Sequence, residues 1–230
     1  MKIGGFQKTS LLDYPDRISA IVWTVGCNFK CPFCYNKTLV DGSADVISED
    51  EVLSFLKKRK GLLEGLVISG GEPFLQKDLV GFTENVKKLG YLVKIDTNGM
   101  YPERLKELIN NKLVDYVAVD IKAPKQKYSR LAGVKADLSK LEQSIDTIKN
   151  SVPNYEFRTT FVPDLLTKKD IIEIAKWLEG AETFYLQQFR VNPPLISSKM
   201  EKIKPYSKEY LIETLENIKP FFKNCYLRGV

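Results

Sequence analysis

The chain has 230 residues, of which 43% are hydrophobic and 28% are charged, an ordinary composition for one folded domain of the α/β size class. It contains no histidine, which excludes Ser-His-Asp and Cys-His nucleophilic mechanisms, histidine general bases and every histidine-containing zinc site. The net charge of +6 comes from lysines scattered among acids, which favours a solvated basic surface over a nucleic-acid footprint.

No apolar run reaches the length of a membrane helix, and the first residues lack the apolar core of a signal peptide. We therefore expect a cytoplasmic protein with no membrane association. The four cysteines are grouped three plus one, which is no disulfide framework and is more typical of metal binding or redox chemistry in a reducing compartment. We expect a single domain over residues 1–230, with a short lead-in over 1–17.

Short apolar, β-branched runs alternate with helical patterns along the chain. They predict strands at Ile18–Thr24, Leu66–Ser69, Leu92–Asp96, Tyr116–Ile121, Tyr155–Phe161 and Thr183–Phe189. Helix signals between them include a capping box at Ser48 and Glu51, an end at Gly90, a first turn at Pro102, an N-cap at Thr167 and a last helix over 207–218.

This alternation predicts an α/β fold with a parallel sheet covered by helices. Six strand-helix units are too few for a closed eight-stranded barrel. We therefore expect a partial (β/α)6 TIM-like barrel whose parallel sheet is open on one side, with a doubly wound sheet as the alternative.

The first predicted strand leads directly into Cys27, Cys31 and Cys34, spaced C-x3-C-x2-C. Three thiolates can hold a four-iron cluster by three irons and leave the fourth iron open to another ligand. A closed zinc site needs a fourth ligand, and only Cys225, in an apolar C-terminal stretch, remains. Ligand count and spacing therefore favour an iron–sulfur cluster, and Cys225 is interpreted as a small buried hydrophobe.

Polar residues also follow the next strands, at the edge where parallel α/β sheets bind their ligands. Ser69-Gly70-Gly71-Glu72-Pro73 ends the second strand. Its paired glycines allow a close backbone approach, and Glu72 suits a cationic group such as an ammonium. The motif lacks the Lys-Ser/Thr ending of a phosphate loop, and by itself it is equally compatible with a simple turn.

The third strand ends in Asp96-Thr97-Asn98-Gly99, where turn or N-cap roles are the alternative. Asp120 and Lys122 share one face of the fourth strand, and a charged pair within an apolar strand needs an explanation. Arg158 and Thr160 share a face of the fifth strand, and the sixth ends in Gln187-Gln188-Phe189-Arg190, whose pattern does not decide which glutamine faces inward.

Together these motifs resemble those of radical S-adenosylmethionine (SAM) enzymes. Cys27, Cys31 and Cys34 match the cluster motif, Phe33 its aromatic position, and Gly70–Pro73 the loop for the SAM ammonium. Within the superfamily the chain most resembles glycyl radical enzyme activating enzymes, and its opening Gly4–Ser10 is most similar to the activating proteins of anaerobic ribonucleoside-triphosphate reductase. The resemblance to glycyl radical enzyme activating enzymes rests on Ser10–Arg17, Gly26–Asn28, Asp96–Gly99 and Asp120–Lys122. Two departures are Tyr35, where the family often has histidine, and Gln188 or Arg190 near a late histidine of some members.

The resemblance implies a [4Fe–4S] cluster and SAM as cofactors. It implies that one electron from a flavodoxin or ferredoxin cleaves SAM to methionine and a 5′-deoxyadenosyl radical, which abstracts a Cα hydrogen from a glycine of a partner enzyme, here anaerobic ribonucleotide reductase. The implied cofactor-binding residues are Phe33, Gly70, Gly71, Glu72, Pro73, Asp96, Asn98, Lys122, Arg158 and Gln188. Asp96, Thr97 and Asp120 are implied as a monovalent cation site.

Two other functions stay open. A radical SAM enzyme acting on a small molecule or a tRNA base, in deazapurine synthesis or tRNA modification, is compatible with the positive charge. A cluster-bearing electron carrier would cleave no SAM and would not need the polar strand ends. The basic, proline-punctuated segment 192–205 is interpreted as a surface loop, with a partner-facing role as the alternative.

Overall fold

Strands and helices alternate through residues 1–152, 154–191 and 194–230, which are the residues that the computed structural model describes. Asn192 and Pro193 of the basic segment thus lie outside the described residues. The strands are β1 Ile3–Ser10, β2 Ser19–Thr24, β3 Gly65–Gly70, β4 Leu92–Thr97, β5 Tyr116–Asp120, β6 Tyr155–Phe161, β7 Thr183–Gln188 and β8 Asn224–Arg228. The α-helices are α1 Lys37–Asp41, α2 Glu49–Lys58, α3 Leu79–Lys88, α4 Pro102–Asn110, α5 Tyr128–Ala132, α6 Leu138–Ser151, α7 Lys168–Trp177 and α8 Lys208–Ile218.

Strand order follows the chain from β1 to β8, in the open and largely parallel arrangement that the sequence predicts. The fold class, an α/β partial barrel, is confirmed. The described residues divide into two compact units. Unit 1 comprises Met1–Asn28, Thr38–Ala118 and Lys140–Asn154, and unit 2 comprises Phe29–Lys37, Val119–Ser139 and Tyr155–Val230. The single domain over 1–230 stays a prediction.

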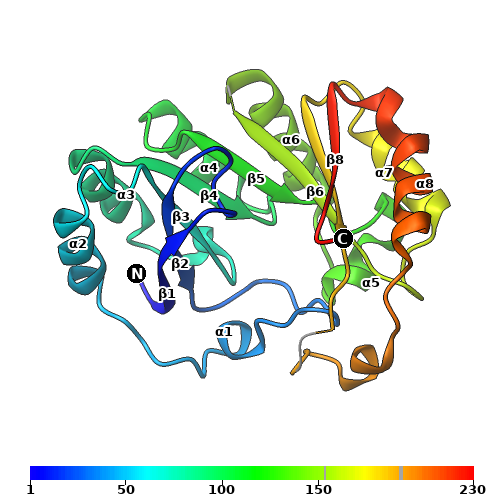
Figure 1. The fold of residues 1–230 in the computed structure, drawn as a ribbon, viewed down its shortest axis with the longest axis horizontal. Helices are drawn as coiled ribbons and strands as arrows, with labels where there is room; N and C mark the ends of the chain where they lie inside the picture. Colours follow the sequence, from blue (N-terminus) through cyan, green and yellow to red (C-terminus); the bar gives the residue numbers. More distant parts are fainter. Residues whose placement is uncertain (153, 192–193) are drawn as a thin grey trace. The chain divides into compact units, whose positions relative to one another are not determined.

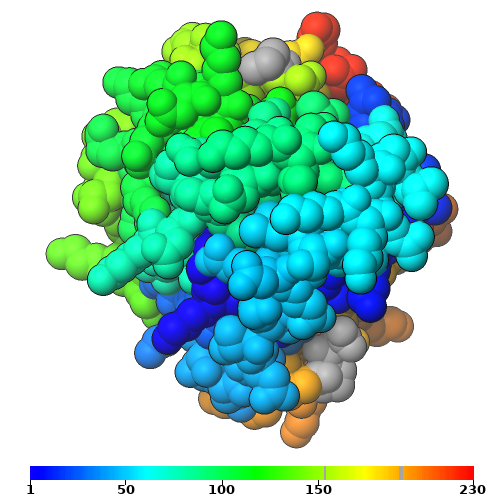
Figure 2. Space-filling model, turned by 90° about the vertical axis from the view of Figure 1, so that its left-hand side faces the viewer, coloured from blue at the N-terminus to red at the C-terminus, as the bar shows by residue number. Residues whose placement is uncertain are grey.

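In unit 1, β1 pairs antiparallel with β2, and β2, β3 and β4 run parallel (Figure 1). Ile21 of β2 and Val67 of β3 are buried side by side with Tyr14, against which Tyr116 packs. The helices α2 and α3 contact each other, and α3 lies against β4. Figure 2 looks onto the outer face of these helices, drawn in cyan and blue-green. One apolar helix face and one apolar sheet face thus bury each other.

In unit 2, β6, β7 and β8 run parallel, and α8 packs against α7, β7 and β8. Phe184 of β7 stacks on Phe222 with ring centroids 4.7 Å apart. The helix α7 begins after the predicted N-cap Thr167, and α8 begins one residue after its predicted start, with Ser207 as its N-cap. Thr167 forms a reciprocal capping box with Asp170, and the Ser207 side chain accepts the Tyr210 N–H. No helix in the described part of the chain is long and apolar enough to cross a membrane.

Two strands, β1 and β8, were not predicted. β1 lies inside the predicted lead-in, and its Gly-Gly and Gln-Lys pairs hide the alternation of a strand. β8 contains Cys225, which is half-buried rather than fully buried. Both are edge strands that pair on one side only, so burial imposes a weaker pattern on their sequences.

Candidate functional site

The three clustered cysteines lie on the loop that follows β2, and none of them forms a disulfide. The loop leaves unit 1 after Asn28 and enters unit 2 at Phe29. Burial raises the pKa of the Cys31 thiol to about 11, and the nearby ammonium of Lys122 opposes that rise. Burial also raises the pKa of Cys34, and a hydrogen bond from the Asn36 backbone N–H opposes that rise. Such thiols become thiolates when a positive centre binds them, as iron does.

The donor set fits a four-iron cluster. Among the described residues, no three His, Cys, Asp or Glu side chains converge as ligands of a single ion would. A cluster instead spreads its cysteine ligands over several irons, and three free thiols on one short loop match that need. These cysteines are the residues that would hold the cluster.

The Ser69–Pro73 loop braces the start of the cysteine loop. The Gly71 N–H donates to the Thr24 carbonyl at 2.9 Å, and the Glu72 N–H donates to the Gly26 carbonyl at 2.8 Å. Gly70 has φ of 115°, and a Cβ at either Gly70 or Gly71 would clash with backbone atoms of the β2 exit. The close approach that the paired glycines permit is therefore an approach to the chain's own backbone.

The Glu72 carboxylate is fully buried and tied to the end of β4. The Thr97 hydroxyl and the Asn98 N–H each donate to it at 2.8 Å, and the Phe74 N–H donates at 3.2 Å. The Asn98 amide also donates to the Asn28 side chain at 2.7 Å, one residue beyond Cys27. Glu72 and Asn98 thus hold the entry to the cysteine loop, and their contacts with SAM stay predictions.

Two further side chains that sequence reasoning missed secure the same entry. The Gln76 amide donates to the Val25 carbonyl at 2.7 Å, and its oxygen accepts the Lys2 N–H at 2.8 Å. Arg104 of α4 donates to the carbonyls of Phe74 and Gln76. Pro73 begins the 3-10 helix η1 Pro73–Leu75, which this arginine clamps. No sequence pattern marked Gln76 or Arg104, because the partners of these two side chains are backbone atoms of distant segments.

Asp96 is paired within its own strand. The Lys94 Nζ lies 2.5 Å from Asp96 Oδ1, and the lysine side chain is 2% exposed. The same ammonium lies 5.7 Å from the centroid of the Tyr116 ring. Sequence reasoning missed Lys94, although the period of two places it on the same face as Asp96. The Lys94 ammonium therefore already binds one carboxylate oxygen of Asp96, which was predicted as a ligand of a monovalent cation.

In unit 2, the Asp120 carboxylate binds two cations. The Arg158 Nε lies 2.6 Å from Asp120 Oδ1, and the Lys122 Nζ lies 3.3 Å from Oδ2. Burial alone would raise the pKa of Asp120, but the charges of Arg158 and Lys122 outweigh it and hold that pKa well below its usual range. Asp120 and Lys122, which the sequence analysis placed on one face, form a half-buried ion pair. Arg158 joins them.

The same network extends to two residues that sequence reasoning missed. Glu156 of β6 is fully buried and lies 3.5 Å from Arg158 and 3.0 Å from Arg228 of β8. The Arg228 guanidinium lies 3.9 Å from the centroid of the Tyr185 ring. Glu156 stands two positions before Arg158, and this spacing was the available signal. No sequence signal pointed to Arg228, because its strand was not recognised.

The remaining predicted residues have definite places in unit 2. Phe33 is buried, and Tyr35 is exposed directly after Cys34. Gln187 pairs in register with Thr160, whose hydroxyl accepts its amide N–H at 3.5 Å. The neighbouring Gln188 donates instead to the Tyr206 carbonyl at 2.7 Å. The face shared with Arg158 and Thr160 therefore belongs to Gln187, and the placement of Gln188 lends no support to a SAM contact.

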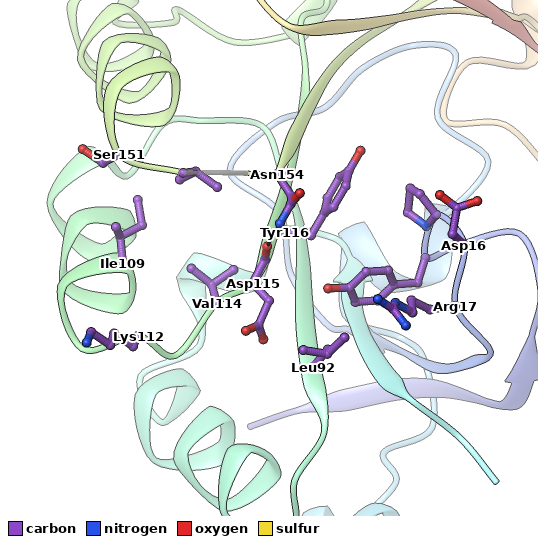
Figure 3. A pocket seen from close by; sticks show the side chains of 13 residues that line it. Asp16, Arg17, Leu92, Ile109, Lys112, Val114, Asp115, Tyr116, Ser151 and Asn154 are labelled. Atoms are coloured by element: carbon purple, nitrogen blue, oxygen red, sulfur yellow. Dashed lines mark hydrogen bonds between the residues drawn. The ribbon is translucent and has the colours of Figure 1, made fainter. Parts of the chain in front are cut away.

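A separate cavity of about 620 Å³ lies at the opposite ends of the strands in unit 1. It is lined by Leu92 at the start of β4 and Tyr116 at the start of β5, with Arg17, Asp115 and Ser151 around it (Figure 3). Ligands of parallel α/β sheets bind at the carboxyl ends of strands, and none of the predicted site residues lines this cavity. It is not the site that the motifs predict.

Known proteins are similar to this chain in sequence and in fold. Residues 21–178 match the radical SAM superfamily. A "Putative glycyl-radical enzyme activating enzyme" of Methanocaldococcus jannaschii is 35% identical, over 99% of this chain and 96% of its own length. A second protein of that organism with the same description is 29% identical over 94% of this chain and 84% of its own length.

Two solved structures show the fold. Streptococcus suis SuiB superposes with a TM-score of 0.69 at 16% identity over 91% of this chain and 48% of SuiB, so the chain spans about half of that protein. A domain of pyruvate-formate lyase-activating enzyme from Bacteroides vulgatus superposes with a TM-score of 0.57 at 16% identity, over 72% of this chain and 99% of that domain. The chain belongs to the radical SAM superfamily, whose cofactors are a [4Fe–4S] cluster and SAM.

Proposed function

We propose that this radical SAM enzyme activates a glycyl radical enzyme. The observation that carries the proposal is the 35% identity with the M. jannaschii protein of that description, over nearly the full length of both chains. When bound, the cluster and SAM supply reductive cleavage of SAM and a 5′-deoxyadenosyl radical, which takes a hydrogen atom from a glycine of the partner.

The roles of the chain's residues follow from their chemistry. Cys27, Cys31 and Cys34 would bind three irons, leaving the fourth for the amino and carboxylate groups of SAM. Lys122 and Arg158 are the cations for the SAM carboxylate or ribose. Asp120 holds both cations in place but offsets only one of their two positive charges, so a bound anion would meet a positively charged site held in position by an existing network.

Further SAM contacts come from the resemblance. Phe33 would pack near the adenine, and carbonyls of the Gly70–Pro73 loop would accept the SAM ammonium. The buried bonds of Glu72 support a positioning role, because they fix the loop that presents those carbonyls. A rigid loop of this kind orients SAM without moving during the reaction.

Anaerobic ribonucleoside-triphosphate reductase is the partner that we propose, from the similarity of Gly4–Ser10 to its activating proteins. A flavodoxin or ferredoxin is the proposed electron donor. The alternative, action on a small molecule or a tRNA base, predicts RNA binding that falls steeply with ionic strength.

Electron paramagnetic resonance tests the function directly. The reconstituted protein, reduced with dithionite, is mixed with SAM and each candidate anaerobic reductase or lyase of the same genome. We expect a glycyl radical doublet with the reductase, present only when SAM is added. If no candidate gives a SAM-dependent doublet, the proposed function is wrong.

A pair of cysteine variants provides the matched control. Cys31→Ala is expected to lose the intact cluster and all SAM cleavage, whereas Cys225→Ala, in β8, is expected to keep both. Iron content and the visible absorption of the cluster are measured alongside methionine release. A full cluster with full cleavage in Cys31→Ala would contradict the ligand assignment.

A further inference from the structure

Residues 195–205, which we call the strap, are bonded directly to the cysteine loop within unit 2. The Ile196 N–H donates to the Cys34 carbonyl and the Ser197 N–H donates to the Pro32 carbonyl, each at 3.0 Å. The side chain of Leu195 is buried, and so is that of Met200 in the 3-10 helix η3 Ser198–Lys202, drawn in orange in Figure 1. These bonds and anchors hold the strap in a fixed position beside two of the cluster cysteines.

The outer side of the strap is positively charged. Lys199, Lys202 and Lys204 are exposed, and no acid among the described residues forms an ion pair with any of them. The one acid of the strap, Glu201, accepts the Leu195 N–H at 3.0 Å and is half-buried. Tyr35, which follows Cys34, is 57% exposed. The cysteine loop therefore reaches the surface next to an uncompensated cluster of lysines.

The proposed function needs one electron from outside the chain. An electron passes between proteins efficiently only over a short distance, so its donor must dock beside the cysteines. Small one-electron carrier proteins of acidic surface complement a patch of unpaired lysines, because opposite charges steer and orient the encounter. A surface built only for solubility would not need hydrogen bonds to the cysteine loop itself.

We propose that the strap is the docking surface for a small acidic one-electron carrier protein. This rests on the proposed function. The reduced carrier gives one electron to the oxidised cluster and is itself oxidised by one electron; no bond forms or breaks and no proton moves in the step. Lys199, Lys202 and Lys204 bind the carrier's acidic side chains, and the backbone bonds of Ile196 and Ser197 fix the strap against the cysteine loop.

Charge reversal tests the surface. The strap variant is Lys199→Glu/Lys202→Glu/Lys204→Glu. Its control, Lys57→Glu/Lys106→Glu/Lys140→Glu, makes the same change in net charge at exposed lysines of α2, α4 and α6. Both are reconstituted with the cluster, and stopped-flow absorbance follows the oxidation of a photoreduced acidic ferredoxin. At low ionic strength we expect the strap variant to be slower by about tenfold or more, and the control to match the wild type.

Two further measurements complete the test. The dissociation constant for oxidised ferredoxin is expected to rise in the strap variant alone, and the salt dependence of its electron transfer is expected to flatten. A neutral variant, Lys199→Gln/Lys202→Gln/Lys204→Gln, is expected to show an intermediate loss, which separates a charge effect from a folding defect.

Dithionite separates this inference from the proposed function, since a small reductant needs no docking surface. Dithionite-driven SAM cleavage is expected to be the same in the strap variant and the wild type. Equal electron transfer from ferredoxin in the two proteins would overturn the docking surface and leave the activase function intact. The docking surface would also be overturned if the strap variant oxidised ferredoxin at the normal rate but formed no glycyl radical with dithionite. That result would show that the strap binds the glycyl radical enzyme instead.

Discussion

β4 and the end of β5 each have a lysine and an aspartate two residues apart, in opposite order and in different surroundings, with Lys122 lying just beyond β5. In β4, Lys94 lies deep in the strand and its ammonium is 2.5 Å from Asp96, beside the Tyr116 ring. At the end of β5, Asp120 comes first, and its carboxylate is shared between Lys122 and Arg158. The first is a pair inside a strand; the second is one part of a network that continues into β6 and β8.

The two sites should therefore tolerate the loss of a charge differently. A buried ion is costly once its partner is removed, because the remaining charge has lost both water and its counter-ion. At Asp120, a second cation stays in place when either one is removed. We therefore expect the β4 pair to affect stability more strongly than the larger network does, and the predictions below test that order.

The largest effect is expected for Lys94→Met. It removes the ammonium 2.5 Å from Asp96 in a nearly water-free strand, and we expect the free energy of unfolding to fall by about 3–5 kcal/mol. Urea unfolding of the cluster-free protein measures it, with Lys57→Met at an exposed helix position as the control. The double variant Lys94→Met/Asp96→Asn should recover part of the loss. A loss below about 1 kcal/mol in the single variant would show that the pair is not a buried one.

A smaller loss is expected for Arg158→Met, about 1.5–3 kcal/mol, the range for hydrogen bonds to charged groups. Asp120 keeps Lys122, and Glu156 keeps Arg228 at 3.0 Å. Lys122→Met is expected to behave similarly, and the double variant should lose more than the sum of the two single losses, because only then is Asp120 left without both cations. Strict additivity would contradict a shared network.

The pH dependence of that loss gives a finer measurement. The folded-state pKa of Asp120 is held below its unfolded value by Arg158 and Lys122, against the effect of burial. The carboxylate therefore contributes stability above pH of about 4, and this contribution is lost as the pH falls through the unfolded and then the folded pKa. The stability gap between wild type and Arg158→Met should shrink as the pH falls below about 4 towards the wild-type folded pKa, by about 1.4 kcal/mol for each pKa unit that Arg158 supplies. If this stability gap did not change with pH, Arg158 would stabilise the fold by packing and not by its charge.

The two regions also differ in how much the sequence could predict. The Asp120 and Lys122 pair is visible as two charges in an apolar strand, and the cysteine, glycine and Asp96–Gly99 motifs mark the strand ends. Lys94 is harder to recognise, because a lysine in a strand usually faces solvent. Its burial depends on Asp96 and on the ring of Tyr116, which belongs to a strand whose placement beside β4 is a tertiary fact.

Long-range partners account for the other misses. Glu156 and Arg228 lie 72 positions apart, and β8 was not recognised as a strand. The bonds of Gln76 and Arg104 go to backbone carbonyls, which every residue possesses, so no sequence pattern could select them. The paired glycines were noticed for their close backbone approach, but the sequence could not show that the β2 exit is a segment they approach.

The smallest effect is expected for a third lysine–aspartate pair, outside the β4 and β5 sites. Lys87 of α3 lies 2.7 Å from Asp115, at the cavity of Figure 3, and about a quarter of each side chain is exposed. Asp115 also accepts the Val93 N–H at 2.7 Å, so it keeps a donor when the lysine is removed. Lys87→Met should therefore reduce stability by about 0.5–1 kcal/mol, and salt should screen most of that difference. In urea unfolding at low and high ionic strength, the Lys94→Met loss should stay nearly constant while the Lys87→Met loss fades, because only the latter pair is open to ions. Equal salt sensitivity of the two would mean that burial does not set the order of these effects.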